Sequence, residues 1–288
     1  MSNYYLYRIG RFLAKVLPIG VSSALVMVLC DLHFRFSKTD RQAVENNLKI
    51  VHKTDHVPNP EVRAVFRNFG KNLLELFTMS KRLQPAFIES NVHIKNIEYL
   101  NEALQKGKGG IIVSAHLGNW EIAGGVLPML GFPLSVVALA HQDPRVNALF
   151  NAQREVFGTM VIQADVVAVR RVLEHLHKNR LVTILADRDF GNHGIMMDFF
   201  GRKTMIPKGA AFFSMKTGDP IIPGFFFHTD DDHFEINVYP PIEPPHVPDG
   251  KITDEAARDY IQKYLTIIED EIRKNPSQWL LFREFWKP

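Results

Sequence analysis

The chain has 288 residues, 46% hydrophobic and 11% aromatic, which is enough for a large globular core and excludes a disordered chain. A single cysteine, Cys30, excludes a disulfide framework and a cysteine-based zinc cluster, so the composition favours a reducing compartment. The net charge of +3 is uneven: residues 1–90 carry 13 Lys/Arg against 7 Asp/Glu, whereas the remainder carries 21 against 24.

The N-terminal segment joins tyrosines and cations to an apolar run from Val16 to Cys30. A cleaved signal peptide is set aside because no small-x-small site follows the run. Pro18 interrupts the run and Asp31 closes it, and a spanning helix needs about 20 apolar residues. Of three alternatives, a full span, a buried helix and an interfacial helix, we expect the third: residues 1–35 form one helix on an anionic membrane surface.

The rest of the chain shows two kinds of periodicity. Residues 36–90 carry apolar side chains at helical spacing, which predicts a helical region leading into the main domain. From about residue 92, short Val/Ile/Leu runs alternate with helical stretches. This pattern predicts an α/β domain over residues 36–288, with a single, mostly parallel mixed sheet flanked by helices. The expected strands include IIVSA, LSVVALA, MVIQ, LVTILA, PIIPGFFF and FEINVY.

Polar residues follow several of these strands directly. In open α/β sheets, ligands bind beyond the carboxyl ends of the strands. His116 follows IIVSA, His141 and Arg145 follow LSVVALA, and Asp187 and Asp189 follow LVTILA. We therefore expect a site at this edge of the sheet.

The stretch AHLGNWE predicts a general base. A spacing of five on one helix would put His116 and Glu121 about 140° apart, so we expect His116 in a loop, Asn119 as helix N-cap and Glu121 in the first turn. A carboxylate beside an imidazole fixes its tautomer and stabilises the imidazolium. The chain has no G-x-S-x-G elbow, and Cys30 lies in the apolar run, so the expected nucleophile is a substrate hydroxyl activated by His116.

The stretch LADRDFG allows two interpretations. Asp187 and Asp189 could share a divalent cation that holds a sugar-nucleotide diphosphate, which would make the protein a glycosyltransferase. Alternatively, they accept hydrogen bonds, pair with a cation such as Arg154 or Arg188, and shape the pocket. We favour the second, since no nucleotide-binding motif accompanies them. His175-x-His177 and HTDDDH (228–233) are interpreted as helical and turn residues, so no metal site is expected.

A cluster of Met and Phe side chains in residues 196–213 predicts a surface for an acyl chain or a bilayer, with about half of these side chains in the hydrophobic core. Pro207, Lys208 and Gly209 open a helix there, and free backbone N–H groups beside Lys208 predict an anion or oxyanion site.

The motifs occur together in the order typical of one family. AHLGNWE, ADRDFG, DFFGRKTMIPKGAAFFSMKTGDPIIPGF and the closing PSQWLLFREFWKP resemble the bacterial lipid A biosynthesis acyltransferases, the late lauroyl and myristoyl transferases of the lysophospholipid acyltransferase superfamily. Further likeness in LYRIGRFLAKVLP, ENNLKIV and FRNFGKNLLELF extends the resemblance over essentially the whole chain.

The resemblance implies a glycerolipid acyltransferase-like fold. It also implies acyl transfer from an acyl carrier protein or acyl-CoA thioester to a hydroxyl of a membrane glycolipid, a lipid A precursor first of all, at the cytoplasmic face of the inner membrane. Alternative acceptors are a phosphatidylinositol mannoside, an ornithine lipid or a lysophospholipid. A non-catalytic membrane- or carrier-binding scaffold is a further alternative. Neither a metal or redox cofactor nor a nucleic-acid partner is expected.

By motif, His116 corresponds to the family's histidine and Glu121 to its acidic partner. The third motif falls at Asp187 and Asp189. The expected substrate-binding residues are Asn119, Arg145, Arg154, Arg170, Asp187, Asp189, Lys208 and Gly209.

Overall fold

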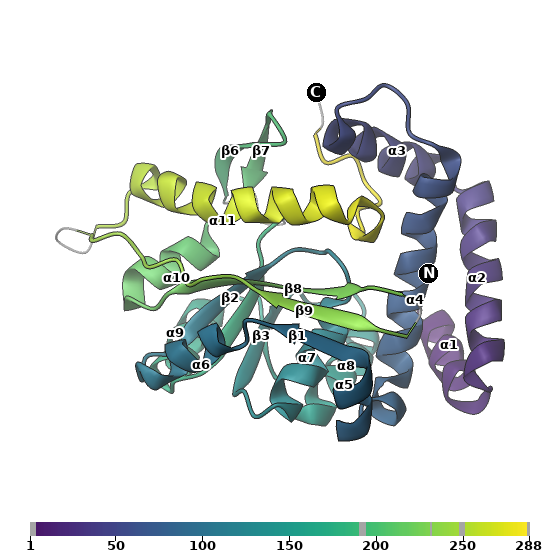
Figure 1. Cartoon of the computed structure of the whole chain (residues 1–288), viewed down its shortest axis with the longest axis horizontal. Coiled ribbons are helices and arrows are strands. Elements are labelled where there is room, and N and C mark those ends of the chain that lie inside the picture. Colours follow the sequence, from purple (N-terminus) through teal and green to yellow (C-terminus); the bar gives the residue numbers. More distant parts are fainter. Residues whose placement is uncertain (1–3, 190–193, 231, 248–250, 287–288) are drawn as a thin grey trace.

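A seven-stranded mixed sheet forms the centre of the molecule (Figure 1). This computed structural model describes residues 4–189, 194–230, 232–247 and 251–286. The strand order is β1-β9-β8-β2-β5-β3-β4, and every neighbouring pair is parallel except β8 and β9. The predicted mostly parallel mixed sheet is therefore confirmed. The strands are β1 (Val92–Lys95), β2 (Gly110–Ser114), β3 (Leu134–Ala138), β4 (Met160–Gln163), β5 (Leu181–Leu185), β8 (Ile221–His228) and β9 (Phe234–Val238).

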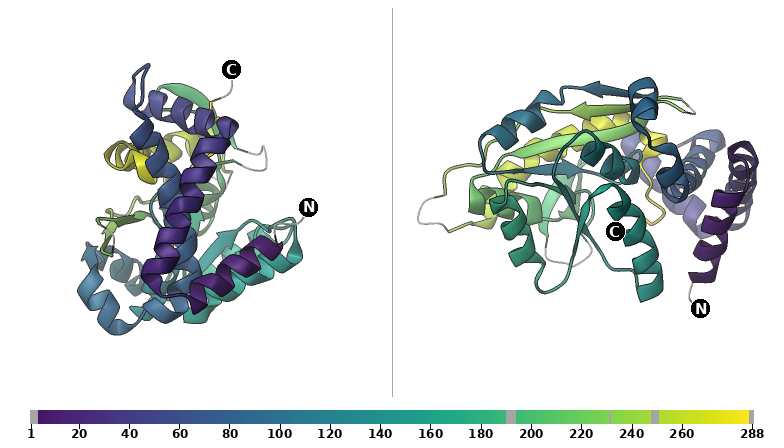
Figure 2. Two further views of the ribbon diagram at one scale, coloured as in Figure 1. Left: turned by 90° about the vertical axis from the view of Figure 1, so that its right-hand side faces the viewer. Right: turned by 90° about the horizontal axis from the view of Figure 1, so that it is seen from below.

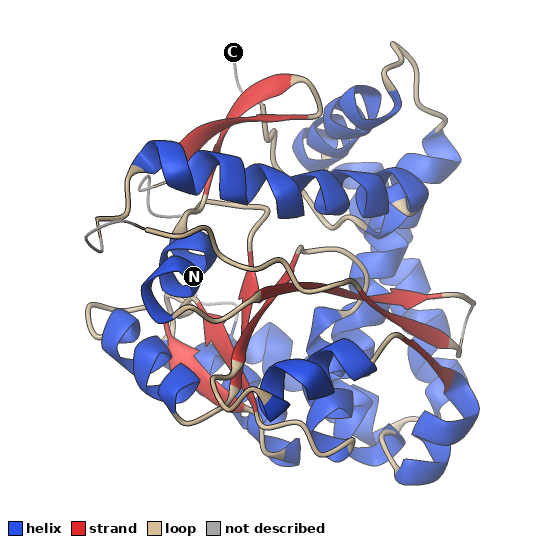
Figure 3. Ribbon diagram, turned by 60° about the vertical axis from the view of Figure 1, so that its left-hand side comes forward, coloured by secondary structure: helices blue, strands red, loops and turns tan. Residues whose placement is uncertain are grey.

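Helices cover both faces of the sheet, as Figure 3 shows. Alternate side chains of β2 point to opposite faces, so Ile111 and Val113 join one apolar cluster and Ile112 joins the other. The first cluster is closed by α9 (Ala168–His177), α10 (Gly209–Thr217) and α11 (Asp254–Lys274). The second is closed by α6 (Glu98–Gln105), α7 (Trp120–Met129) and α8 (Pro144–Arg154). Strand β2 is the middle strand of the sheet, and both of its faces are buried.

The N-terminal region is helical, as expected, but the predicted single helix over residues 1–35 is wrong. The chain instead forms α1 (Tyr4–Val16) and α2 (Ile19–Phe36), which meet at an angle (Figure 2). Pro18 separates them because proline has no N–H to donate and disfavours a helical conformation in the residue before it. Helices α3 (Lys38–His52), α4 (Asn59–Arg82) and α5 (Pro85–Asn91) follow.

The contact between α2 and α4 combines a buried and a charged part. Cys30 packs so closely on Gly70 that a Cβ atom at residue 70 would lie 2.2 Å from its sulfur. Next to it, Asp31 accepts hydrogen bonds from both Arg63 and Arg67, and these bonds hold the pKa of Asp31 well below its usual range. Asp31, which ends the apolar run, therefore links α2 to α4 through these hydrogen bonds.

The Met/Phe segment forms a second, two-stranded sheet, the hairpin of β6 (Ile195–Phe199) and β7 (Arg202–Ile206). Met197, Phe199 and Phe200 are buried, and they pack against Trp279 and Trp286 of the C-terminal tail. These side chains belong to the part of the cluster expected in the core, whereas Met196 is 45% exposed.

Candidate active site

His116 lies in the loop between β2 and α7, as predicted, at the carboxyl end of the central strand. The loop is held by backbone hydrogen bonds on both sides: Leu280 N donates to His116 O (2.9 Å), and Asn119 N donates to Phe226 O (2.8 Å). Gly118 has φ +65°, and a Cβ atom there would lie 2.0 Å from the Phe226 carbonyl oxygen. The turn after His116 therefore requires glycine.

The carboxylate that contacts His116 is Asp187. His116 Nδ1 lies 2.8 Å from Asp187 Oδ1, and Trp279 Nε1 donates to Asp187 Oδ2 over 3.0 Å. Asp187 is fully buried, whereas the His116 side chain keeps 18% of its surface exposed. Ser114 and Leu185 are register partners, so β2 and β5 end side by side and bring these two side chains together.

Electrostatics favour a neutral imidazole beside an ionised carboxylate. Burial is the largest influence on His116 and lowers its pKa below the ordinary 6.5, with Arg188 acting in the same direction and Asp187 opposing. Burial favours the neutral form of Asp187, but His116, Arg188 and Trp279 outweigh it and hold the pKa of this carboxyl well below its usual range. Since an ionised carboxylate only accepts, we assign the proton of His116 to Nδ1, which leaves the basic lone pair on Nε2.

Glu121 lies in the first turn of α7, as predicted, but its expected pairing with His116 is wrong. Its two carboxylate oxygens accept hydrogen bonds from Arg154 Nε (2.9 Å) and Arg154 Nη2 (2.6 Å). A guanidinium binds a carboxylate in this two-point manner more strongly than a neutral imidazole does. Glu121 still acts on His116 through space, since its charge raises the pKa of the imidazole, although less than Asp187 does. The hydrogen bond that orients the imidazole therefore comes from Asp187.

The remaining candidate residues have different surroundings. Asn119 is fully buried; its Oδ1 caps α7 by accepting from Ile122 N (3.1 Å), which confirms the predicted N-cap but leaves its predicted contact with substrate untested. Asp189 accepts a hydrogen bond from the backbone N–H of Gly194, the residue before β6 (2.8 Å). This is the predicted hydrogen-bonding role of Asp189.

The other basic candidates lie on the surface. Arg145 pairs with Asp143 and packs over the Tyr4 ring (4.5 Å to its centroid), and Arg170 is exposed on α9. Helix α10 begins at Gly209, two residues after the predicted first helical residue Pro207. Lys208 is its N-cap residue, and Lys208 Nζ lies 2.8 Å from Asp254. These contacts leave the predicted anion or oxyanion site at α10 without direct support.

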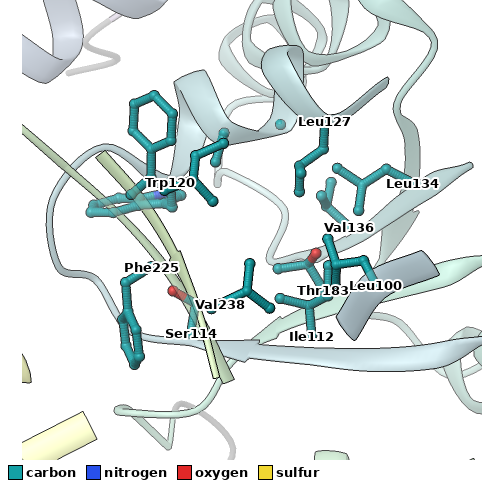
Figure 4. Close-up of a pocket in the computed structure, with 15 residues that line it drawn as sticks. Leu100, Ile112, Ser114, Trp120, Leu127, Leu134, Val136, Thr183, Phe225 and Val238 are labelled. Carbon is teal, nitrogen blue, oxygen red and sulfur yellow. The ribbon is translucent and has the colours of Figure 1, made fainter. Parts of the chain in front are cut away.

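An apolar slot lies between the sheet and α7 (Figure 4). It holds about 560 Å³ of empty space, part of it open to solvent, and its lining is mostly apolar. Ser114 and Trp120 line it, and the Trp120 ring meets the His116 ring edge to face with centroids 5.1 Å apart. Trp120 therefore lies against both the slot and His116. The other walls of the slot are Leu100, Ile112, Ala123, Gly124, Leu127, Leu134, Val136, Thr183, Gly224, Phe225, Phe226, Ile236 and Val238.

The sequence did not reveal two side chains of the site, Trp120 and Trp279, whereas Arg188 was one of the two cations expected to pair with Asp187 and Asp189. The distance from Arg188 Nε to Asp187 Oδ2 is 3.7 Å, and the guanidinium also donates to the Leu280 carbonyl. The only sequence signal for Trp279 is the PSQWLL motif of the tail. Among the described residues, no group of three His, Cys, Asp or Glu side chains is placed to hold a metal ion.

An α/β sheet with a histidine–carboxylate pair at its carboxyl edge, beside an apolar slot, is suited to proton abstraction from a hydroxyl next to a hydrophobic substrate. The sequence profile of the bacterial lipid A biosynthesis acyltransferases matches residues 1–288, and the chain belongs to this family. It is therefore an acyltransferase of lipid metabolism. This membership favours acyl transfer over the glycosyltransferase and scaffold alternatives.

Named relatives agree with this class. The chain is 24% identical over 233 residues to a phosphatidylinositol mannoside acyltransferase of Mycolicibacterium smegmatis, covering 80% of this chain and 73% of the relative. It is 26% identical over 236 residues to the protein of that name from Mycobacterium tuberculosis (strain CDC 1551 / Oshkosh), covering 80% and 71%. A lipid A biosynthesis acyltransferase of Haemophilus influenzae is 25% identical over 146 residues, covering 50% and 46%.

Proposed function

We propose that the protein transfers a fatty acyl group from an acyl thioester, on acyl carrier protein or CoA, to a hydroxyl of a membrane glycolipid. The observation that carries this proposal is the His116–Asp187 pair, which contacts the apolar slot through the Trp120 ring. His116 Nε2 removes the proton of the acceptor hydroxyl as its oxygen attacks the thioester carbonyl. Asp187 stabilises the imidazolium, and the proton then goes to the thiolate that leaves.

The acyl chain is proposed to occupy the slot under β2. Ser114 lies two residues before His116 on the strand side of the loop, and Ile112 lies further along the same face. A chain bound from Trp120 towards Leu134 therefore runs along the strand, with its thioester end beside the imidazole. The apolar lining excludes water from the hydrocarbon, which stabilises binding at roughly 0.8 kcal/mol per buried CH₂.

The N-terminal helices are proposed to dock on the cytoplasmic face of the inner membrane. Helix α2 is long and apolar enough to cross a membrane by length and composition, and only 11% of it is buried inside the protein. Helix α1 adds Arg8, Arg11 and Lys15, which suit anionic headgroups. Exposed apolar side chains on the two helices are Tyr5, Leu6, Ile9, Phe12, Val16, Ile19, Val21, Leu25, Val28, Leu29, Leu32 and Phe36.

A transfer assay tests the function. The purified protein is incubated with a ¹⁴C-labelled acyl group carried on acyl carrier protein or on CoA. The acceptor is a lipid A precursor, a phosphatidylinositol mannoside or a lysophospholipid, and each reaction is run with and without EDTA. We expect label in one of the two glycolipids, with and without EDTA. Label in none of the acceptors would contradict acyl transfer, label in the lysophospholipid alone would contradict the glycolipid acceptor, and loss of transfer with EDTA would contradict metal-free catalysis.

Gly124 gives a test of the slot. It lies on α7 in the slot wall, and a Cβ atom there would meet no other atom within 4 Å. The Cβ atom of Gly124→Leu therefore has room, its side chain should occupy part of the slot, and the change should stabilise the helix by about 0.8 kcal/mol. We expect the rate with the longest accepted acyl donor to fall by about tenfold or more, and shorter donors to retain their rate.

Gly20→Leu is the matched control, since Gly20 is an exposed helical glycine of α2 with the same open surroundings. Its chain-length profile should equal that of the wild type. An unchanged profile in a folded Gly124→Leu variant would place the acyl chain elsewhere.

A further inference from the structure

Behind the loop that carries His116 lies a buried polar cluster of Glu75, Asn119 and His228, which come from three distant parts of the chain. Glu75, on α4, is 2% exposed, and Asn119 is fully buried. Asn119 Nδ2 donates to Glu75 Oε2 over 2.5 Å. His228, at the end of β8, has its Nε2 2.8 Å from the same oxygen and 3.0 Å from Oε1.

The hydrogen bonds fix the direction of each group. Asn119 Oδ1 caps α7, so its Nδ2 must point to Glu75. Within the described part of the chain, His228 Nδ1 meets no hydrogen-bond partner, which places the proton of a neutral imidazole on Nε2, where Glu75 accepts it. Glu75 therefore receives two N–H groups, one from the loop of His116 and one from β8.

Helix α4 holds the same loop at a second point. Asn72, one turn before Glu75, donates through Nδ2 to the Gly118 carbonyl (2.6 Å). On the other side, the Gln278 side chain accepts from His228 N (3.0 Å) and donates to His228 O (2.9 Å). Helix α4, β8 and the C-terminal tail thus meet around residues 118–119, two to three residues after His116.

We propose that Glu75 is a positioning residue for His116, acting through Asn119 and the catalytic loop. This inference rests on the proposed function. A buried carboxylate is a costly way to fill space, because an apolar side chain of similar volume often stabilises a fold as well or better. Glu75 Oε2 accepts from Asn119, while both oxygens of Glu75 lie within hydrogen-bond distance of His228 Nε2, so the carboxylate holds the two groups together. By holding the loop, the cluster orients the His116 imidazole towards the hydroxyl that His116 deprotonates.

Glu75→Gln tests the proposal. If its amide oxygen takes the place of Oε2, the amide NH₂ group takes the place of Oε1 and faces His228 Nε2–H, so that two donors oppose each other. We expect kcat to fall about 10-fold to 100-fold, since a misplacement near 1 Å has effects of this size. The KM for the acyl donor should stay unchanged, because Glu75 does not line the slot. The matched control is Glu271→Gln. Glu271, on α11, is also 2% exposed and accepts hydrogen bonds from Tyr239 and Lys274, neither of which belongs to the cluster. It should lose stability but keep kcat.

A folded Glu75→Gln variant with wild-type kcat would overturn the proposal. If that variant does not fold, Asn119→Ser replaces it: serine keeps a capping oxygen for α7 but has no amide to donate to Glu75. The same loss of kcat is expected, and a wild-type kcat would again overturn the proposal.

Failure of the proposed function would appear differently, as no transfer by the wild type. In that case the imidazole NMR signals of His116, recorded without substrate, test the positioning role of Glu75. These signals should shift in Glu75→Gln and not in Glu271→Gln. Unchanged His116 signals in Glu75→Gln would overturn the positioning role independently of activity.

Discussion

Replacing His116 with alanine is expected to lower kcat for acyl transfer by about 10³-fold, within the range that a positioned general base contributes. The methyl group cannot accept a proton, and the chain offers no second imidazole hydrogen-bonded to Asp187 among its described residues. Initial rates of transfer from labelled acyl donor to lipid, at saturating concentrations of both substrates, measure the effect.

His116→Gln separates catalysis from folding. In His116→Ala the buried Asp187 loses one hydrogen-bond donor, which destabilises the fold by about 1–3 kcal/mol. Glutamine can restore a donor to Asp187 but cannot act as a base. We therefore expect His116→Gln to be closer to wild type in its melting temperature and as inactive as His116→Ala. Near wild-type turnover in either variant would refute the assignment of the base.

Asp187→Asn is expected to lower kcat by about 10³-fold to 10⁴-fold, as the equivalent change does where a carboxylate orients a catalytic histidine. The introduced amide, held by Trp279 Nε1–H on its oxygen, would present N–H to His116 Nδ1. That contact favours the tautomer with the proton on Nε2, which cannot take a proton from the substrate. Turnover and the imidazole ¹⁵N shifts of His116 measure the loss and its cause.

Glu121→Gln is the control for Asp187→Asn. Both variants remove a negative charge near His116, but the Glu121 carboxylate is bound to Arg154 and reaches the imidazole only through space. We expect a clearly smaller decrease in kcat than with Asp187→Asn. A larger decrease with Glu121→Gln would return the orienting role to Glu121 and contradict the structural assignment.

Local sequence signals were sufficient to predict structure where a strand ends and the next helix begins within a few residues. The six strands named from their apolar runs are present, His116 lies in the expected loop and Asn119 is the expected N-cap. Each depends on backbone rules that act over a few residues. The β6–β7 hairpin was missed because apolar and polar residue types do not alternate in IMMDF and RKTMI, although β6 itself buries every second residue. Strand β1 was missed because it has only four residues.

The partner of His116 could not be read from spacing. Glu121 is five residues from His116 and Asp187 is 71 residues away, and only the order of strands in the sheet decides which carboxylate is near. Placing β5 directly beside β2 brings Asp187 to the imidazole, while α8 brings Arg154 to Glu121. The slot could likewise not be predicted from the sequence, because its lining residues come from five strands and two helices.

The pH dependence of kcat/KM tests most directly whether His116 is the base. Because burial lowers the pKa of His116, the neutral base persists below pH 6.5, and the acid limb of the wild-type profile should have its midpoint below that value. The residual activity of His116→Ala should lack this limb, and Glu121→Gln should keep it, moved to lower pH, since it loses a charge that raises the pKa. An acid limb that persists unchanged in His116→Ala would show that another group removes the proton.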